Sequence, residues 1–426
     1  GSVIGGRAIL ALDPGALGRL AAGHRSAVVS GTNGKTTTTS LLRAALSTAG
    51  PVVTNLEGAN LPPGLAAALA GGAPGARAAL EVDEAWLGRV VAAVRPEVAV
   101  LLNLTRDQLD RNNEVRTLAS SWRRTFAEHP DTVVVANCDD PLVVWGAGAA
   151  GAVRWVAAGQ PWTADASGCP ACGGAIEFDP PAGAGDAPPA GEDDASPAGG
   201  EAEPVAGQQG APRRPTGDEA GGWRCTQCDL HRPPPDVRLA GDRVIDADGT
   251  VTAVRLELPG RANRANAAMA LTAARCLGAE NERGAEAMAE TTEVVGRYRT
   301  VRMDGVAVRF LLAKNPAGWL EVLDMMPPPP VPAVVVINAR IADGRDPSWL
   351  WDVPFERLAG RRVLATGERG RDLAVRLRYA GLDHRYVADA VDAVKEGVAE
   401  AHRAGTDRLE VVANYTSFQD LRARLP

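Results

Sequence analysis

The sequence predicts an α/β protein in which a doubly wound parallel sheet with a phosphate-binding loop is followed by a smaller α/β domain. Three observations predict it. Short apolar runs alternate with segments of helical character, a glycine-rich loop joins the first run to the first helix, and a second alternating series begins near residue 300. Alternating strands and helices are typical of parallel sheets covered by helices.

The composition is that of a globular protein with an aliphatic core. Hydrophobic residues make up 45% of the 426 residues and aromatic residues only 4%. A net charge of −7 disfavours a protein that coats nucleic acid, because such proteins are usually basic. We find neither a signal peptide nor the run of about 18 apolar residues that a transmembrane helix needs, so we expect a cytoplasmic location. The chain begins at Gly1 rather than at a methionine, so we expect its natural start to differ.

Four short apolar runs predict buried parallel strands, since strands covered on both faces are apolar throughout. They lie at residues 26–30, 78–82, 98–102 and 132–136. The helices that we expect in the same region lie at residues 36–49, 83–94, 115–129 and 264–277. Together these segments predict a first domain over residues 1–299.

A second alternating series predicts a smaller domain over residues 300–426. The proline run at 327–330 is expected to be a stiff extended connector. The strands that we expect after it lie at residues 333–338, 362–365 and 409–413, and the helix lies at residues 389–403.

The strongest motif is the glycine-rich loop between the first strand and the first helix. It reads Gly31-Thr32-Asn33-Gly34-Lys35-Thr36-Thr37. Glycines let a backbone wrap phosphates, and a helix N-terminus directs N–H groups and partial positive charge at them, so we expect this loop to bind a nucleotide. Lys35 can reach the β- and γ-phosphates of ATP, and Thr36 can offer its hydroxyl to Mg²⁺.

Two Cys-x-x-Cys pairs, Cys169 with Cys172 and Cys225 with Cys228, predict a zinc ribbon over about residues 165–235. Four thiolates leave no open position on the metal, so the site is expected to be structural, and a redox dithiol is the alternative. His231 is expected at the surface. The remaining cysteines, Cys138 and Cys276, are expected to be small buried apolar residues rather than nucleophiles.

An acidic insertion separates the two cysteine pairs. Residues 180–222 consist mainly of Pro, Ala, Gly, Glu and Asp, with almost no large apolar side chains. Such a segment cannot bury enough surface to offset the entropy of ordering, so we expect it to be disordered.

The phosphate loop, with several segments in the same order, resembles the Mur ligases and the folylpolyglutamate synthases. Residues 80–84, Leu-Glu-Val-Asp-Glu, are similar to the segment whose glutamate binds Mg²⁺ in that family. The resemblance assigns this role to Glu81, with Glu84 as the alternative. Residues 103–110 are similar to a segment in which a histidine helps to hold a second metal, but Gln108 stands in its place here and puts that metal in doubt.

Three more segments complete the resemblance. Residues 137–141, Asn-Cys-Asp-Asp-Pro, are similar to a family segment near the nucleotide base. The Gly-x-x-Asn-x-x-Asn series that ends at Asn266 implies a contact between Asn266 and adenine. The Gly-Arg pair at 296–297 implies that Arg297 approaches the nucleotide phosphates.

A narrower resemblance is to the ATP-binding subunits of lipid II isoglutaminyl synthase, the MurT group of the Mur ligases. It rests on the cysteine pairs inside the nucleotide-binding part, on the few residues before the loop, which leave no room for a uridine-nucleotide domain, and on residues 343–352, Asp-Gly-Arg-Asp-Pro-Ser-Trp-Leu-Trp-Asp. It implies ATP-dependent amidation of the D-glutamate α-carboxylate of the lipid II stem peptide, through an acyl phosphate. The ammonia comes from glutamine, freed by a GatD-like glutaminase partner.

In the MurT group, an aspartate of the C-terminal domain completes the Cys-His pair of the partner. We favour Asp346 for this role, then Asp352, then Asp343; helix capping by these acids is the alternative. Trp349 and Trp351 are either interface anchors or core residues. Within the same reading, Lys35 and Glu81 act on the phosphoryl group. A stand-alone amino acid ligase and a zinc-ribbon nucleic-acid-binding regulator are the competing functions.

Overall fold

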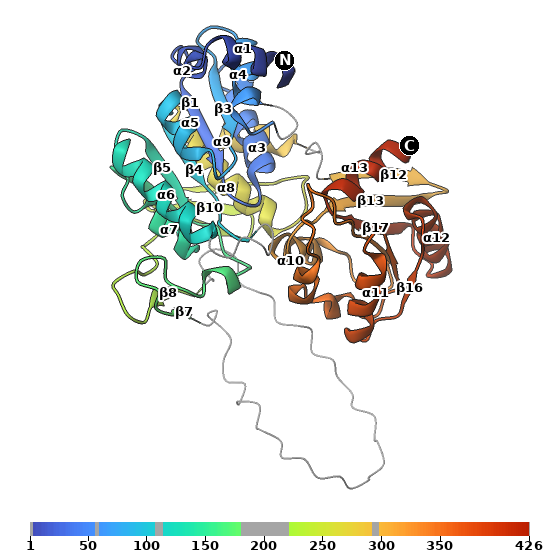
Figure 1. The fold of residues 1–426 in the computed structure, drawn as a ribbon. Coiled ribbons are helices and arrows are strands. Elements are labelled where there is room, and N and C mark those ends of the chain that lie inside the picture. The colour runs from blue at the N-terminus through green and yellow to red at the C-terminus, as the bar shows by residue number, and fades with distance from the viewer. Residues whose placement is uncertain (1–2, 56–58, 107–113, 180–220, 292–297, 426) are drawn as a thin grey trace.

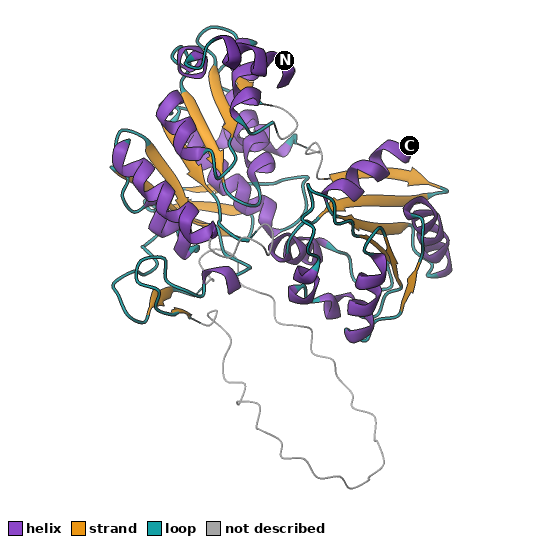
Figure 2. Ribbon diagram, viewed as in Figure 1, coloured by secondary structure: helices purple, strands orange, loops and turns teal. Residues whose placement is uncertain are grey.

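The computed structural model describes residues 3–55, 59–106, 114–179, 221–291 and 298–425. Two sheets, each covered by helices, make up most of it (Figures 1 and 2). The first sheet has nine strands in the order β11-β10-β9-β6-β5-β4-β1-β3-β2. Its strands are β1 (Ser26–Ser30), β2 (Val52–Thr54), β3 (Arg77–Glu81), β4 (Val98–Leu101), β5 (Val133–Asn137), β6 (Ala152–Ala157), β9 (Val237–Ala240), β10 (Arg243–Asp246) and β11 (Val251–Ala253).

All neighbouring strands of this sheet from β2 to β9 run parallel, and β10 and β11 extend its edge in antiparallel fashion. Helices cover both faces. They are α1 (Val3–Leu12), α2 (Ala16–Ala21), α3 (Lys35–Ser47), α4 (Pro62–Ala70), α5 (Leu87–Val94), α6 (Glu114–Glu128), α7 (Pro141–Ala147), α8 (Arg261–Cys276) and α9 (Asn281–Ala289).

Successive strand residues point to opposite faces and thereby divide the core into two layers. In β1, Ala27 and Val29 pack with α3, α8 and α9, whereas Val28 packs with α4 to α7. Trp122 and Phe126 of α6 are fully buried in the second layer. The fold is therefore the expected doubly wound sheet.

The strand predictions for this sheet are correct to within about a residue, but two helix predictions are wrong at their starts. The helix expected from residue 264 begins at Arg261. The helix expected from residue 83 begins only at Leu87. Asp83 to Trp86 form a turn instead. The Asp83 carboxylate accepts from the N–H of Ala85 at 3.0 Å, and the backbone carbonyl of Asp83 accepts from the N–H of Trp86 at 3.0 Å. The Asp83 side chain thus binds a backbone N–H within this turn and gives the chain an alternative to a first turn of helix.

The second sheet has six strands in the order β12-β13-β17-β14-β15-β16, parallel except for β12. The strands are β12 (Tyr298–Met303), β13 (Val306–Leu312), β14 (Ala333–Val336), β15 (Val363–Thr366), β16 (His384–Tyr386) and β17 (Arg408–Ala413). Its helices are α10 (Pro316–Met325), α11 (Gly370–Tyr379), α12 (Ala390–Arg403) and α13 (Tyr415–Arg424), with short 3-10 turns at Ser348–Asp352 and Phe355–Leu358. The domain boundary near residue 300 stays a prediction.

A small two-stranded hairpin lies beside the first sheet (Figure 1). It pairs β7 (Ile176–Phe178) with β8 (Trp223–Cys225) in antiparallel fashion, and a 3-10 turn at Ala164–Ala166 precedes it. The insertion expected at 180–222 lies outside the described residues except for its last two. Of the helices that the structure describes, each is too short or too polar to span a lipid bilayer.

Candidate active site

The phosphate loop follows β1 at the carboxyl edge of the sheet, where parallel α/β folds bind their ligands. Gly34 directly precedes α3 and has a φ of 85°, a left-handed conformation that favours glycine. A Cβ at this position would lie 2.6 Å from Oδ1 of Asn266, so a side chain has no room. The sequence-predicted loop and Asn266 of α8 therefore come together.

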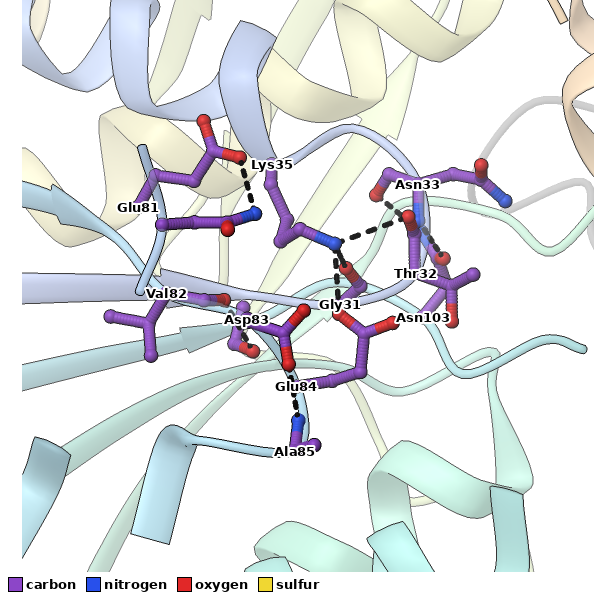
Figure 3. Close-up of polar contacts among 12 residues, drawn as sticks. Gly31, Thr32, Asn33, Lys35, Glu81, Val82, Asp83, Glu84, Ala85 and Asn103 are labelled. Atoms are coloured by element: carbon purple, nitrogen blue, oxygen red, sulfur yellow. Dashed lines mark hydrogen bonds and ion pairs between the residues drawn. The ribbon is translucent and has the colours of Figure 1, made fainter. Parts of the chain in front are cut away.

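Lys35, the first residue of α3, is buried with its side chain folded back along the loop (Figure 3). Its ammonium nitrogen donates to the carbonyl oxygens of Gly31 at 2.6 Å and Thr32 at 3.3 Å. It also forms an ion pair with Oε2 of Glu84 at 2.8 Å. The sequence-based prediction placed Glu81 at the metal with Glu84 as the alternative, and in this structure Glu84 is the partner of Lys35.

Glu81 ends β3 and lies apart from this ion pair (Figure 3). Its buried carboxylate accepts from Nδ2 of Asn60 at 3.3 Å. Two residues on, burial and the charge of Glu84 raise the pKa of Asp83, while the charges of Lys35 and Lys314 oppose that rise. Acidic and basic groups thus gather beside the phosphate loop, and Lys314 comes from the C-terminal part of the chain.

The segment after β4 fixes the other side of the loop. The N–H of Asn33 donates to Oδ1 of Asn103 at 2.9 Å, and Nδ2 of Asn103 donates to the carbonyl of Asn33 at 3.1 Å. Thr32 and Thr105 are joined by two further hydrogen bonds of 3.0 Å. Gln108, the residue that put the second metal in doubt, lies outside the described residues.

A cleft opens beside the phosphate loop. Its lining includes Asn33 of the loop, Asn137 at the end of β5, Trp162 and Asn266. Two residues predicted near the nucleotide base, Asn137 and Asn266, therefore line one cleft with the phosphate loop. Arg297, which was predicted to approach the nucleotide phosphates, lies outside the described residues.

The C-terminal part of the chain closes the cleft through α10. Ala317 and Glu321 of α10 line it. Asn315 caps α10 by accepting from the N–H of Gly318 at 2.8 Å, and its Nδ2 donates to Oδ1 of Asn33 at 3.3 Å. The phosphate loop thus contacts residues that follow the second sheet's strand β13.

The four paired cysteines come together although up to 59 residues separate them in sequence. Sγ of Cys169 lies 3.7 Å from Sγ of Cys228, and Sγ of Cys172 lies 3.5 Å from Sγ of Cys225. All four sulfur atoms lie within 4.8 Å of one another. The nearby His231 is exposed, as predicted.

The two single cysteines differ in burial. Cys138 is fully buried, and burial raises the pKa of its thiol far above the ordinary value, so it is the inert apolar residue that the sequence predicted. Cys276 is only half-buried, although burial also raises its pKa.

The three aspartates of residues 343–352 have different surroundings. Asp343 is buried and accepts hydrogen bonds from the N–H and the hydroxyl of Thr416, at the start of α13. Asp346 is exposed and accepts from the N–H of Ser348 at 2.9 Å, which keeps its pKa below the usual range. Asp352 is exposed at the end of the 3-10 turn. The hydrogen bond from Ser348 to Asp346 is the kind of contact that the alternative role, capping of a helix start, predicts.

The structure separates the two tryptophans of this segment. Trp349 is buried in the core of the second sheet with Leu350 and Phe355. Trp351 is 55% exposed and packs edge-on against Tyr379 of α11, which is 76% exposed. The expectation of a core residue fits Trp349, and the expectation of an interface anchor fits the surroundings of Trp351.

Comparison with known proteins gives the family. The Mur ligase middle domain matches residues 29–156, and the MurT ligase C-terminal domain matches residues 312–418. Lipid II isoglutaminyl synthase (glutamine-hydrolyzing) subunit MurT of Streptococcus pneumoniae is 26% identical over 454 aligned residues, which cover 100% of this chain and 92% of that protein. The MurT subunit of Staphylococcus aureus is 26% identical over 374 residues, covering 83% of this chain and 77% of its own length. This chain is similar to MurT subunits along its whole length, and it contains a Mur ligase middle domain and a MurT ligase C-terminal domain.

A solved Mur-type ligase has the same fold. The pseudomurein peptide ligase type C from Methanothermus fervidus superposes with a TM-score of 0.64 at 17% sequence identity, over 94% of this chain and 79% of that one. As a MurT-type Mur ligase, the chain is a ligase, and its family implies ATP and Mg²⁺ as cofactors.

The loop of this MurT-type chain fits a nucleotide phosphate. No acidic residue occupies the first turn of α3, so the positive end of the helix dipole is not offset there. Glu81 and Thr36 offer the oxygen ligands that Mg²⁺ prefers. When bound, Mg²⁺ would neutralise charge that develops on phosphoryl oxygens.

The cysteine cluster of the MurT-type chain fits a tetrahedral zinc ion. Four sulfur atoms at the usual Zn–S distance lie about 3.8 Å apart in an ideal tetrahedron. The two measured separations, 3.5 and 3.7 Å, are close to that value. Two of the sulfur–sulfur separations thus match a zinc site, and all four sulfur atoms lie within 4.8 Å of one another, so the four cysteines could fill all four positions of a zinc ion.

Sequence reasoning missed several residues of the cleft. Trp162 and Gln160 carry no motif, since they lie in an irregular segment after β6. Asn315 followed by Pro316 is a helix-start signal that could have been recognised, because asparagine is a strong N-cap and proline is common at the first helical position. The contact of Asn315 with the phosphate loop could not have been recognised from the sequence.

Proposed function

We propose that this chain amidates the α-carboxylate of the D-glutamate residue in the lipid II stem peptide, forming D-isoglutamine with ATP and with ammonia from a glutaminase partner. The observation that carries this proposal is the similarity to MurT subunits of lipid II isoglutaminyl synthase along the entire chain. The match of residues 312–418 to the MurT ligase C-terminal domain adds to it.

The chemistry needs activation, because a carboxylate is not attacked by ammonia at a useful rate. A carboxylate oxygen of the substrate attacks the γ-phosphorus of ATP, the bond to the ADP oxygen breaks, and an acyl phosphate forms. The nitrogen lone pair of ammonia then attacks the acyl carbon, phosphate leaves with the bonding electrons, and the amide loses a proton. Lys35 stabilises the charge on the phosphoryl oxygens, and Thr36 and Glu81 would hold Mg²⁺, which would neutralise part of that charge.

Lys35 must change partner before it can act in this way. In this structure its ammonium group is neutralised by Glu84 at 2.8 Å. A triphosphate carries more negative charge than one carboxylate, so it displaces Glu84 as the partner of Lys35. Lys314, from the C-terminal part of the chain, opposes the rise in the pKa of Asp83 and so adds positive charge beside the phosphate loop.

The exposed edge near Asp346 supports a glutaminase partner of the GatD kind. Hydrogen bonds from Ser348 hold the pKa of Asp346 below its ordinary value and so favour its charged form. Trp351, five residues further along the chain, forms an exposed aromatic pair with Tyr379. Exposed aromatic residues are typical anchors of protein interfaces, and an exposed aspartate of the same segment can orient the histidine of a partner's Cys-His pair.

The decisive experiment combines the purified chain with a glutaminase-like partner, lipid II, ATP and glutamine that carries heavy nitrogen in its amide group. We expect the heavy nitrogen in the stem peptide by mass spectrometry, at the D-glutamate α-position. Turnover of ATP by the single chain with a free amino acid, and no label in lipid II, would instead indicate a stand-alone amino acid ligase.

A further inference from the structure

The wall of the cleft opposite the phosphate loop is built from two backbone segments that one buried carboxylate joins. Oδ2 of Asp139 accepts from the N–H of Gly159 at 2.6 Å. The N–H of Asp139 donates to Oδ1 of Asn137 at 3.1 Å, and Nδ2 of Asn137 donates to the carbonyl of Gly159 at 3.3 Å. Asn137 and Gly159 both line the cleft, so the position of Asp139 determines the shape of this wall.

The other oxygen of Asp139 is bound by the cysteine ribbon, defined here as residues 168–179 and 222–232. Nε of Arg232 donates to Oδ1 of Asp139 at 2.6 Å, and both side chains are largely buried. A second contact joins the ribbon to the same segment, since Nε1 of Trp223 donates to the carbonyl of Cys138 at 3.0 Å. Trp223 is itself 3% exposed.

The cysteine cluster determines where Arg232 and Trp223 lie. Trp223 begins β8, the strand that ends at Cys225. The N–H of Arg232 donates to the carbonyl of Trp223 at 2.9 Å, and Arg232 follows Cys228 by only four residues. Both contact residues are therefore tied by short lengths of backbone to cysteines of the cluster.

The ion pair is needed because Asp139 is buried. Burial raises the pKa of Asp139, and the charge and hydrogen bond of Arg232 oppose that rise. A buried carboxylate that loses its cationic partner is strongly destabilised in its charged form, so it rearranges toward water or takes up a proton. Either response moves Gly159 and Asn137.

We propose that the cysteine ribbon is a positioning element of the nucleotide site, which holds the base wall of the cleft in shape through Arg232 and Trp223. This rests on the proposed function, because it requires the cleft to receive the base of ATP. The ribbon is then more than a stabilising insertion, since its integrity sets the affinity for the nucleotide base while the phosphates bind independently at the loop around Lys35.

The test compares two ligands in the full chain, namely ATP, which has a base, and inorganic tripolyphosphate, which has none. Arg232→Leu is expected to weaken ATP binding about ten-fold by calorimetry, the effect of losing one hydrogen bond to a charged group. Tripolyphosphate affinity should stay within about two-fold of wild type. Arg232→Lys keeps the positive charge and should restore part of the ATP affinity.

A matched control lies on the same strand pair. Arg224 also belongs to the ribbon and pairs with Glu177, but both side chains of this pair are exposed to solvent. Arg224→Leu should leave the affinities for both ligands unchanged. If Arg232→Leu does not fold, Trp223→Phe removes only the hydrogen bond to the Cys138 carbonyl and should show the same selective loss for ATP.

Removal of zinc provides an independent test. Stripping the bound metal with a strong chelator should reproduce the selective loss of ATP affinity, and readdition of zinc should reverse it. Equal ATP affinity in wild type, Arg232→Leu and the stripped protein would overturn the inference, and so would parallel losses for ATP and tripolyphosphate. Failure of the wild-type protein to bind ATP at all would instead overturn the proposed function.

Discussion

The ammonium group of Lys35 and the carboxylate of Glu84 form a buried ion pair, 2.8 Å apart, at the mouth of the phosphate loop. In this partly dehydrated setting the charges interact more strongly than they would in water. Glu84 thus keeps Lys35 paired and in place until a phosphate takes over. The pair separates the two glutamates of the 80–84 segment by role, because Glu81 does not take part in it.

Replacing Lys35 should abolish the reaction without unfolding the protein. Lys35→Met removes the cation that stabilises the phosphoryl oxygens, and we expect amidation to fall by at least about 100-fold. Arg43→Met is the control, because Arg43 is an exposed cation of the same helix. The measurement is the rate of ADP release with partner, lipid II and glutamine present. An Lys35→Met variant with wild-type turnover would remove the basis of the proposed function.

Glu81 and Glu84 should respond differently to magnesium. If Glu81 holds the metal, Glu81→Gln weakens a charged ligand and raises the Mg²⁺ concentration for half-maximal activity by about ten-fold. Glu84→Gln removes the ion-pair partner of Lys35, so its Mg²⁺ requirement should stay close to that of wild type. Magnesium titrations of both variants decide the assignment. The reverse pattern would give the metal to Glu84.

The contribution of Asp140 to the stability of the folded state should decrease as the pH rises. Burial raises the pKa of Asp140 to about 6, above the ordinary value of 3.8. The folded protein therefore binds this proton more tightly than the unfolded chain, so stability is highest below the unfolded pKa and decreases as pH rises through about 6. The full effect is about 3 kcal/mol.

Urea denaturation at a series of pH values tests this, with Asp140→Asn as the comparison. Asparagine is also a good helix N-cap, so α7 should keep its start. The unfolding free energy of the variant should lack the part of the pH dependence that belongs to Asp140, between about pH 4 and pH 6. Identical pH profiles for both proteins would show that Asp140 is not protonated in that range.

The strands that carry the site could be predicted because each is a short apolar run that two helical layers bury. Val98 to Leu101 is an example, with all four side chains buried. The phosphate loop was predictable for a different reason, since its conformation requires glycine at Gly34. In both cases a local physical requirement limits the residue type, and the sequence displays it directly.

The contacts across the cleft could not be predicted, because no local pattern encodes them. The pairing of Lys35 with Glu84 joins residues 49 positions apart, and that of Asp139 with Arg232 joins residues 93 positions apart. Each depends on the relative placement of whole elements. The helix expected from Asp83 failed for a local reason, because the Asp83 side chain bonds the N–H of Ala85 and favours a turn.

The cysteine cluster should bind one zinc ion per chain. Cys172→Ser removes one thiolate from a closed tetrahedral site, so zinc content and resistance to thermal unfolding should both fall. Cys276→Ser is the control, because Cys276 lies outside the cluster. The readouts are metal analysis of the purified protein and a thermal melt with and without chelator. Full zinc occupancy in Cys172→Ser would exclude the four-cysteine site.

Asp346 should be needed for the use of glutamine but not for the use of ammonia. Asp346→Asn keeps the acceptor for the N–H of Ser348 but loses the charge that would orient the partner's histidine. We expect glutamine-dependent amidation to fall by about 100-fold or more. Saturating ammonium chloride should restore the rate, because ammonia then bypasses the partner while ATP activation is intact.

The neighbouring acids make this assignment specific. Asp352→Asn should retain glutamine-dependent activity, and if it alone loses that activity, the partner-facing role belongs to Asp352. Asp343→Asn should chiefly lower stability, since buried Asp343 accepts from both the N–H and the hydroxyl of Thr416. An Asp346→Asn variant that ammonium cannot rescue has lost the activating step itself. Asp346 would then act on the ATP-dependent chemistry of this chain rather than on its partner.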